Sequence, residues 1–432
     1  MKLHLVLKLK PEVDFVEVPH WSVVIQIGIS ELHKFCPPID AFFQRHEIPV
    51  FVTAEYQKGE GDWSQQDRDN GFDRVVRIVL LKNTKLSSQQ LEDLKEIGQG
   101  RIVEYAYLGK VESAPIPVFS KAQGYPQTDA ARKMIYLREA HEQFTKGHPD
   151  VIIAVLDTGI DLSHPELQDC LLSGHDFVDI IDGAGDFFGD HLGIDADAND
   201  EEVGHGTHVA GIIAAKGLRM PIGVAPNCKI LPVRVLGALK QDRHFVGAGL
   251  VDNINNGIKW AIDQGASIIN MSLGIRHSGG GLPHQDVVQY AKQKGVSIVA
   301  ASGNDGTENL YYPSALPHVL SIGALGEARQ VAPFSTRGRV SYTAPGTAIY
   351  SSYIENSYAH SSGTSQAAPF VAGLVALLKS YALEQGRKLT DPQIKYILKH
   401  TADRTGQSLH TQQAGYGSIN AIDALQLLKH KI

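Results

Sequence analysis

The order of apolar and polar residues changes along the chain, and its carboxyl-terminal part alternates between strand-like and helix-like segments. Val151–Leu156 is an unbroken, largely β-branched apolar run, which is typical of a strand buried on both faces of a sheet. The same pattern predicts strands at Ile230–Val235, Ser267–Met271, Ser297–Ala301 and Val319–Ala324, and helices at Val209–Ala215, Gly247–Gln264, Asp286–Lys294 and Ala367–Gln385. This alternation predicts an α/β fold, in which a doubly wound, mostly parallel sheet carries helices on both faces.

Residues 1–113 follow a different pattern, of short alternating runs and charged helical pieces. Strands are predicted at Val23–Ile29, Val75–Leu81 and Arg101–Leu108, and a short helix at Ile39–His46. Ser87 is placed to cap a second helix, in which leucine and isoleucine recur at helical spacing. We therefore expect a smaller amino-terminal α+β domain of four strands and two helices.

Residues 114–130 are rich in proline, glycine and alanine, which interrupt regular structure. We interpret them as a linker. The predicted domains are thus an amino-terminal α+β domain over residues 1–113, a linker over 114–130 and a catalytic domain over 131–432.

Composition narrows the class of protein. The 432 residues are 43% hydrophobic and 20% charged, which are values of a folded globular chain. Only three widely spaced cysteines occur, so we expect no disulfide framework. A net charge of −7 without blocks of Lys or Arg argues against a nucleic-acid partner. No apolar stretch reaches the roughly 20 residues that span a membrane, so we expect no membrane partner. The amino terminus lacks the apolar core of a signal peptide, so we expect a cytoplasmic location, with export by an unconventional route as the alternative.

Three segments place reactive side chains beyond strand ends, where ligands gather in such a sheet. Asp157 directly follows the first apolar run, where a buried carboxylate needs a partner, although it could also cap the next helix. His205 lies at a helix start within Gly204–Gly211, and with His208 it forms a pair that could hold a metal. Ser365 lies at the amino end of the long helix, where free amide groups favour negative charge near its oxygen, or where it serves only as a cap.

Together, in the order Asp, His, Ser, these segments supply a hydroxyl nucleophile, a base and a carboxylate that orients the base. With them the chain resembles the subtilisin-like serine protease family, the subtilases, over about residues 132–427. Further segments that resemble this family are Gly223–Ile230, Ile269–Gly274, Ala301–Asp305, Phe334–Gly338, Ala344–Gly346 and Gly415–Asn420.

The resemblance implies a serine endopeptidase that acts on protein or peptide substrates and requires no cofactor for catalysis. In this interpretation Ser365 attacks the scissile carbonyl, His205 takes and returns the proton, and Asp157 fixes the imidazole tautomer. The side chain of Asn304, with the Ser365 backbone N–H, would hold the oxyanion.

The resemblance also implies the residues that bind substrate. They are Ser272, Leu273, Gly274, Ser302, Gly303, Asp305 and Tyr311. Ser272–Gly274 would bind an extended peptide by strand addition. Tyr311 stands where the family commonly has a small residue, which predicts a shallow specificity pocket, and Asp305 at its rim would favour basic side chains. Gln366 replaces the family's usual Met and Ser302 its usual Ala, and neither change removes a catalytic group.

An acidic loop lies between Asp157 and His205. Its spacing Asp195-x-Asp197-x-Asn199 is similar to that of calcium-binding loops, and subtilases often bind structural calcium, so a calcium site is one interpretation. The alternative is a solvated acidic loop, since the EF-hand pattern fails at its sixth and twelfth positions.

Leu86–Leu108 resembles the last helix and strand of the family's propeptide, which implies that the amino-terminal domain binds the active-site cleft in cis. A permanent accessory domain is the alternative. Two rival functions also stay open at this stage, a catalytically silent peptide-binding or scaffold protein and an exopeptidase of the same fold.

Overall fold

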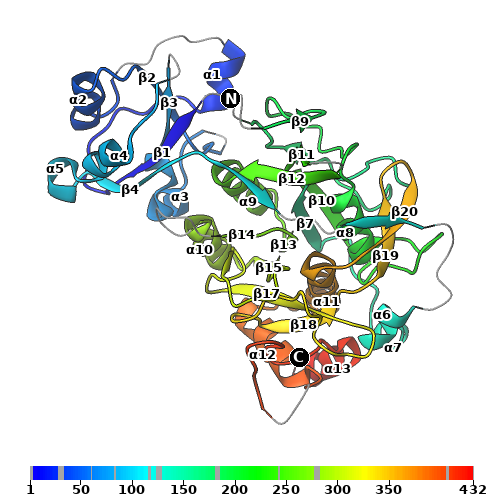
Figure 1. Cartoon of the computed structure of the whole chain (residues 1–432). Coiled ribbons are helices and arrows are strands. Elements are labelled where there is room, and N and C mark those ends of the chain that lie inside the picture. Colours follow the sequence, from blue (N-terminus) through cyan, green and yellow to red (C-terminus); the bar gives the residue numbers. More distant parts are fainter. Residues whose placement is uncertain are drawn as a thin grey trace.

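The computed structural model describes residues 3–27, 34–59, 61–81, 84–114, 118–122, 129–180, 185–241, 244–276, 283–404 and 408–431 (Figure 1). A small amino-terminal unit, residues 3–108, lies against one side of a larger unit that contains the remaining elements.

A seven-stranded sheet forms the centre of the larger unit. Its order is β18-β17-β15-β13-β7-β10-β8, and every neighbouring pair is parallel. The strands are β7 (Ile152–Asp157), β8 (His175–Asp176), β10 (Lys229–Arg234), β13 (Ile268–Met271), β15 (Ser297–Ala301), β17 (Val319–Leu325) and β18 (Tyr342–Pro345). The predicted parallel α/β sheet is thus confirmed. The winding reverses beside β7, and ligands bind at such a point in open α/β sheets.

Helices cover both faces of this sheet. One hydrophobic core is shared by α8 (His205–Ala214), α11 (Thr364–Glu384), α12 (Asp391–Thr401) and α13 (Ala421–Lys431), together with α7 (Leu137–Gln143), which follows α6 (Ala130–Met134). The opposite core holds α9 (Val251–Asp263) and α10 (Gln285–Lys294). Helix α11 is long and apolar enough to cross a membrane, but 83% of its most apolar window is buried inside the protein, as in a core helix.

The amino-terminal unit has a four-stranded antiparallel sheet in the order β2-β3-β1-β4. Its elements are β1 (His4–Leu9), α1 (Trp21–Ile27), α2 (Pro37–Arg45), β2 (Val50–Ala54), α3 (Gln65–Asn70), a 3-10 turn (Phe72–Arg74), β3 (Val75–Leu80), α4 (Ser88–Lys95), α5 (Ile97–Gly100) and β4 (Val103–Leu108). One face of the sheet packs under α2 and α4.

The strand predicted at Val23–Ile29 is wrong over its described part, because residues 21–27 form helix α1. A short apolar run fits either element by its period alone. The His20 ring accepts a hydrogen bond from the Ser22 backbone N–H at 3.3 Å, which satisfies a donor of the first turn.

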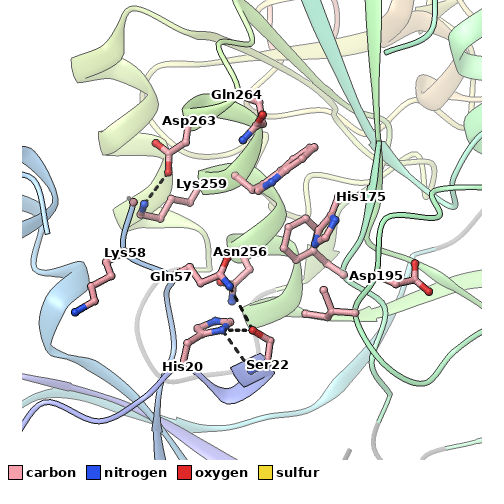
Figure 2. Close-up of a pocket in the computed structure, with 14 residues that line it drawn as sticks. His20, Ser22, Gln57, Lys58, His175, Asp195, Asn256, Lys259, Asp263 and Gln264 are labelled. Carbon is pink, nitrogen blue, oxygen red and sulfur yellow. Dashed lines mark hydrogen bonds and ion pairs between the residues drawn. The ribbon is translucent and has the colours of Figure 1, made fainter. Parts of the chain in front are cut away.

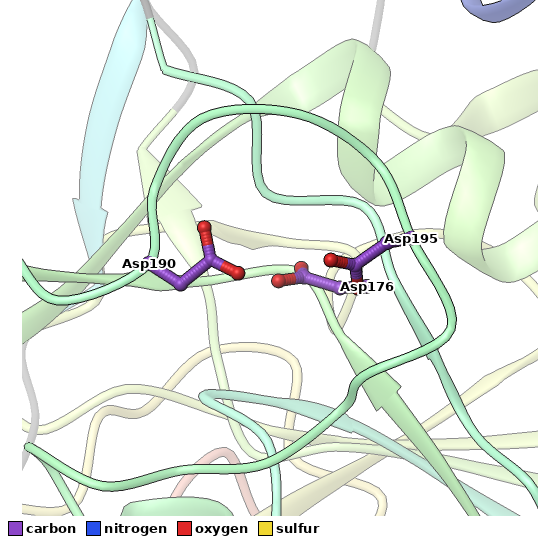
Figure 3. Close-up of side chains that lie close together, drawn as sticks. All are labelled: Asp176, Asp190 and Asp195. Carbon is purple, nitrogen blue, oxygen red and sulfur yellow. The ribbon is translucent and has the colours of Figure 1, made fainter.

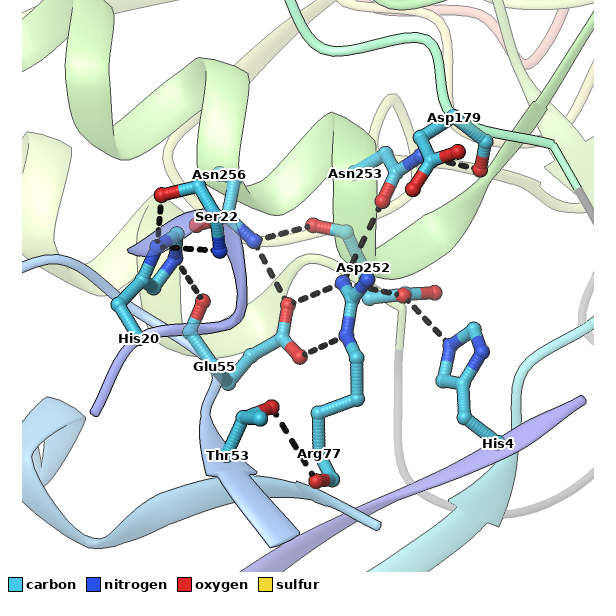
Figure 4. A network of polar contacts seen from close by, with 10 residues as sticks. All are labelled: His4, His20, Ser22, Thr53, Glu55, Arg77, Asp179, Asp252, Asn253 and Asn256. Atoms are coloured by element: carbon cyan, nitrogen blue, oxygen red, sulfur yellow. Dashed lines mark hydrogen bonds and ion pairs between the residues drawn. The ribbon is translucent and has the colours of Figure 1, made fainter. Parts of the chain in front are cut away.

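The other face of the small sheet meets α9 through buried charges (Figure 4). Arg77 donates to both oxygens of Glu55, at 2.7 and 2.8 Å, and to Asp252 of α9 at 2.7 Å. Asp252 also lies 2.8 Å from His4 Nε2, and Asn256 of α9 donates to Glu55 at 2.6 Å. Because buried charges are costly unless they are paired, these contacts fix how the two units meet.

A pocket of about 480 Å³ opens along the same seam (Figure 2). His20 and Lys58 line it from the amino-terminal unit, and the stacked rings of His175 and Trp260 line it from the larger unit.

Two smaller sheets flank the carboxyl ends of the central strands. One has the order β5-β12-β11-β9, and the other the order β19-β20-β6. Their strands are β5 (Val111–Ala114), β9 (Phe187–Phe188), β11 (Gly237–Gln241), β12 (His244–Leu250), β6 (Phe119–Lys121), β19 (Ile349–Tyr353) and β20 (Ser357–Ser361), and β14 (Ile275–Arg276) pairs with β16 (Tyr311–Tyr312). The helix predicted from Gly247 begins only at Val251, because Gly247–Leu250 belongs to β12.

Candidate active site

A buried acid–base pair joins the end of β7 to the start of α8. Asp157 Oδ1 accepts a hydrogen bond from His205 Nδ1 at 2.6 Å, and the two side chains are 0% and 1% exposed. The Thr158 backbone N–H donates to the same oxygen at 2.8 Å. This contact fixes the ring orientation and leaves Nε2 as the atom that can accept a proton.

The glycines around His205 allow the helix to start this close to the strand. Gly204 has φ 78°, in the left-handed region that favours glycine. A Cβ at Gly206 would collide with the Gly159 carbonyl oxygen. The sequence therefore needs glycine on both sides of the histidine to bring it to Asp157.

Ser365 lies in the first turn of α11 and is 3% exposed. Its hydroxyl donates to the Ser272 carbonyl oxygen at 3.0 Å, and the Ser272 hydroxyl donates back to the Ser365 carbonyl at 2.8 Å. His205 Nε2 is buried and has no hydrogen-bond partner among the described residues. The Ser365 hydroxyl proton must therefore be redirected from the Ser272 carbonyl to Nε2, and such contacts often tighten only when substrate binds.

Asn304 follows β15 and is held by the residue before the serine. Its Oδ1 accepts from the Thr364 backbone N–H at 2.8 Å and from the Thr364 hydroxyl at 2.9 Å. Because the backbone N–H can only donate, Oδ1 must face it, and the Nδ2 amino group points away. The donor that an oxyanion would need is thus left free by a fixed orientation.

These residues surround a pocket of about 140 Å³. It is lined by Ser272, Leu273, Gly274, Ala301, Gly303, Asn304, Asp305, Tyr311, Thr364 and Ser365. Of the residues predicted to bind substrate, Ser302 is the one outside this lining: its hydroxyl donates to the Thr336 carbonyl at 3.2 Å.

The pocket is narrow because Tyr311 packs over two of its glycines. A Cβ at Gly303 would lie 2.6 Å from the Tyr311 ring, and one at Gly274 would lie 3.2 Å from Tyr311 Cβ. The Tyr311 hydroxyl donates to Asp305 at 3.1 Å.

Asp305 keeps its negative charge at the rim of this pocket. Partial burial would raise the pKa of Asp305, but hydrogen bonds from Asn309, Thr307 and Thr336 outweigh it and hold the pKa well below its usual range. All of these partners are neutral, so the carboxylate charge is not cancelled by a cation among them.

The acidic loop is arranged differently from the predicted calcium triplet. Asp195 lies close to Asp176 and Asp190, with one oxygen of each within 4.8 Å of the others (Figure 3). Asp197 and Asn199 are instead held by hydrogen bonds within the loop. Asp176 is already paired with Arg234, which supplies positive charge there. Calcium binding stays a prediction.

His208 is turned away from His205. Its Nε2 lies 3.1 Å from the carbonyl oxygens of both Ile349 and Ala359, and burial lowers its pKa to about 3. A neutral ring that donates to backbone is a structural histidine and offers no support for a metal-binding pair with His205.

Sequence reasoning missed three parts of the site. Thr364 fixes Asn304, and β12 pairs with both β11 and β5 ahead of α9, which Gly247 and Gly249 before the helix could have indicated. Asp200 is buried beside the Asp157–His205 pair, and nothing in the sequence separates it from the other acids of its loop.

Comparisons with known proteins show what this chain is similar to. The profile of the Subtilase family matches residues 148–417. A thermophilic serine proteinase of Bacillus sp. (strain AK1) is 36% identical over 339 residues, which cover 77% of this chain and 75% of the relative. The major intracellular serine protease of Bacillus subtilis (strain 168) is 38% identical over 267 residues, 59% of this chain and 77% of the relative. The solved structure of the prenylagaramide maturation protease PagA superimposes with a TM-score of 0.55 at 28% identity, covering 68% of this chain and 98% of that one.

Proposed function

The chain belongs to the subtilase family and is a serine peptidase, and we propose that it is an endopeptidase whose catalytic residues are Asp157, His205, Ser365 and Asn304. The observation that carries this proposal is the buried 2.6 Å contact between Asp157 and His205. A pocket lined by both Ser365 and Asn304 supports it.

In the proposed reaction His205 Nε2 takes the proton of the Ser365 hydroxyl while Oγ bonds to the scissile carbonyl carbon. The electron pair of the carbonyl moves to its oxygen. When the intermediate collapses, the C–N bond breaks and the leaving amine takes the proton from Nε2. Water then repeats the sequence on the acyl-enzyme and regenerates the hydroxyl. Asp157 stays ionised and stabilises the imidazolium throughout.

Stabilisation of the oxyanion is assigned to the Asn304 Nδ2 amino group and the Ser365 backbone N–H. The second donor lies in the first turn of α11, where backbone N–H groups have no partner within the helix. Both donors are fixed before substrate arrives, which is what makes such groups effective.

Internal cleavage is supported by the path of the chain itself. Val111–Ala114 pairs antiparallel with β12, and Phe119–Lys121 pairs antiparallel with β20. The Phe119 ring lies 6.1 Å from the His205 ring. Segments of this chain thus pair with both β12 and β20, and we infer that the cleft can take polypeptide that extends in both directions, as an endopeptidase requires.

The same path supports binding of the amino-terminal unit to the cleft in cis. The buried contacts of Arg77, Glu55 and Asp252 hold the amino-terminal unit on α9 (Figure 4). The chain then continues into β5, which pairs with β12. We propose that this segment limits access to Ser365. Arg77→Met leaves two carboxylates facing each other in a buried seam, so we expect the unit to detach and the cleavage rate of the full chain to rise; an unchanged rate would count against cis restraint.

An intracellular location is proposed from a relative. One of the relatives reported above is named an intracellular serine protease, although other subtilases similar to this chain are named extracellular. Fractionation of the native host tests the proposal, with the protein expected in the cytosolic fraction.

The activity is tested with a peptide blocked at both ends, which an exopeptidase cannot begin to degrade. Wild type should cut it internally and Ser365→Ala should not, while Ser408→Ala, at an exposed serine, should match wild type. Binding of the peptide without cleavage by wild type would favour the silent binder. Intact-mass analysis of the same samples reports any self-cleavage between residues 108 and 125.

A further inference from the structure

We propose that Asp200 is a positioning residue of the peptidase. It fixes the position of the end of β7, which carries Asp157, relative to the start of α8, which carries His205, and it acts through Thr158 and Gly204. The inference rests on the proposed roles of Asp157 and His205, and it adds a residue outside the triad on which their geometry depends.

Asp200 receives hydrogen bonds from both sides of the catalytic pair. Its Oδ2 accepts from the Thr158 hydroxyl at 2.5 Å and from the Gly204 backbone N–H at 2.8 Å. Thr158 is the neighbour of Asp157 and Gly204 is the neighbour of His205. One oxygen atom therefore ties together the two backbone segments that carry the pair.

Thr158 continues this connection into the triad. Its hydroxyl oxygen accepts from the Gly206 backbone N–H at 3.1 Å, and its own backbone N–H donates to Asp157 Oδ1 at 2.8 Å. Because Asp200 accepts the hydroxyl proton, the lone pairs of Thr158 Oγ1 are directed to Gly206. Loss of the Asp200 carboxylate would free this hydroxyl to rotate and loosen the strand end from the helix.

Asp200 also adds to the capping of α8, in which Thr158 already accepts from the Gly206 backbone N–H. The N-cap residue is Gly204, which has no side chain to accept from the first turn, and no acidic residue lies within that turn. Asp200 reaches the helix from outside: Oδ2 accepts from Gly204, and Oδ1 accepts from the Val203 backbone N–H at 2.9 Å. A carboxylate at this end satisfies orphan donors and complements the helix dipole.

Burial separates Asp200 from the rest of its loop. Asp200 is 3% exposed, whereas Asp197 and Glu201 are exposed. A carboxylate is rarely buried without several donors, and here the Thr158 hydroxyl and the backbone N–H groups of Val203 and Gly204 supply three of them. The solvated-loop explanation that fits its neighbours does not fit Asp200.

The test combines four variants of the full chain: Asp200→Ala, Thr158→Val, their double mutant and the matched control Glu201→Gln, which removes one exposed charge from the same loop. Rates are expressed per active site, counted by labelling with a fluorophosphonate to completion. Misplacing a catalytic group by about 1 Å can cost roughly 100-fold, so we expect kcat of Asp200→Ala to fall about 10- to 100-fold with KM nearly unchanged. Glu201→Gln should match wild type.

The double mutant distinguishes positioning from independent damage. If Asp200 acts through Thr158, the double mutant should lose no more kcat than the worse single variant, and Thr158→Ser, which keeps the hydroxyl, should recover most of the rate lost in Thr158→Val. If the fold-losses in kcat of the two single variants multiply in the double mutant, the proposal is overturned. A lowered melting temperature with wild-type kcat per site would also overturn it, because it would leave Asp200 with a stabilising role only.

A spectroscopic measurement keeps the proposal testable even if the proposed function fails. The proton shared by His205 Nδ1 and Asp157 should give a far-downfield proton resonance, since the two atoms are 2.6 Å apart. We expect Asp200→Ala to shift or broaden this signal and Glu201→Gln to leave it in place. An unchanged signal in Asp200→Ala would contradict the positioning role independently of any peptidase assay.

Discussion

The two halves of the candidate active site are built in opposite ways. On the Asp157–His205 side the ring is buried, and Asp157 Oδ1 accepts from both His205 and Thr158. On the Ser365–Asn304 side, Asn304 is held through Oδ1 and its Nδ2 faces away from Thr364. The Ser365 hydroxyl is buried and donates to the Ser272 carbonyl, a hydrogen bond that must break before the hydroxyl can react.

This difference follows from what each half has to do. A base must hold one tautomer and one orientation, so its partners can be permanent parts of the fold. An oxyanion donor must instead meet a group that arrives with the substrate, so its protein contacts hold Asn304 by Oδ1 and keep Nδ2 for that group. The comparison predicts that substitutions in the Asp157–His205 pair, like Ser365→Ala, abolish the chemistry, whereas those at Asn304 and at its support reduce it in steps.

The largest effect is expected from Asp157→Asn. The side-chain amide can present its N–H to His205 Nδ1, which favours the wrong tautomer and leaves Nε2 protonated. We expect kcat to fall about 10⁴-fold with little change in KM. Steady-state kinetics with the end-blocked peptide provide the measurement, and Asp150→Asn, at an exposed acid, is the control. A loss below tenfold would show that Asp157 does not orient the base.

Removal of the oxyanion donor comes next. Asn304→Ala deletes the Nδ2 group, and we expect kcat to fall about 10²- to 10³-fold while KM changes little. Asn227→Ala, at an exposed asparagine, should behave as wild type. If KM rises and kcat stays constant, Asn304 binds the ground state and the proposed oxyanion role is wrong.

A smaller effect is expected at Thr364, which supports Asn304 and does not contact the oxyanion. Thr364→Val removes the hydroxyl that donates to Asn304 Oδ1 and leaves the backbone N–H bond in place. One neutral hydrogen bond contributes about 1 kcal/mol, so we expect kcat to fall about fivefold. Thr364→Ser keeps the hydroxyl and should restore the rate. Equal losses in both variants would assign the effect to packing of the methyl group.

The smallest effect concerns specificity. Asp305→Asn removes the negative charge at the pocket rim, and because this charge is exposed to solvent we expect the preference for lysine over leucine at the cleaved position to fall only about two- to fivefold. Hydrogen bonds hold the pKa of Asp305 well below its usual range, so the group stays charged and the wild-type preference should persist at pH 5. Peptide pairs that differ at that position measure both. Preference for large aromatic residues in wild type would refute the basic specificity.

Sequence patterns predicted the central sheet and the candidate site residues because both depend on residues that are close together in the sequence. A continuous apolar run predicts a buried parallel strand. The run before Asp157 forms β7, and the carboxylate lies at the end of that strand. The amino-terminal apolar segment was misassigned because seven residues do not distinguish a strand from the helix α1.

The parts that sequence could not supply depend on contacts between distant segments. Thr364 reaches Asn304 across 60 positions, and Thr158 reaches Asp200 across 42. Neither pair has a spacing that a periodic pattern would detect. The seam between Arg77 and Asp252 is of the same kind, since both residues read as ordinary surface charges until the two units meet.

The central claim is that Ser365 is a nucleophile activated by His205, and covalent labelling tests it most directly. Intact-mass and peptide mapping after treatment with a fluorophosphonate should find one adduct on Ser365 in wild type, none in Ser365→Ala, and a labelling rate in His205→Ala lower by several orders of magnitude. An adduct on another residue, or labelling of Ser365 at the wild-type rate in His205→Ala, would contradict the account.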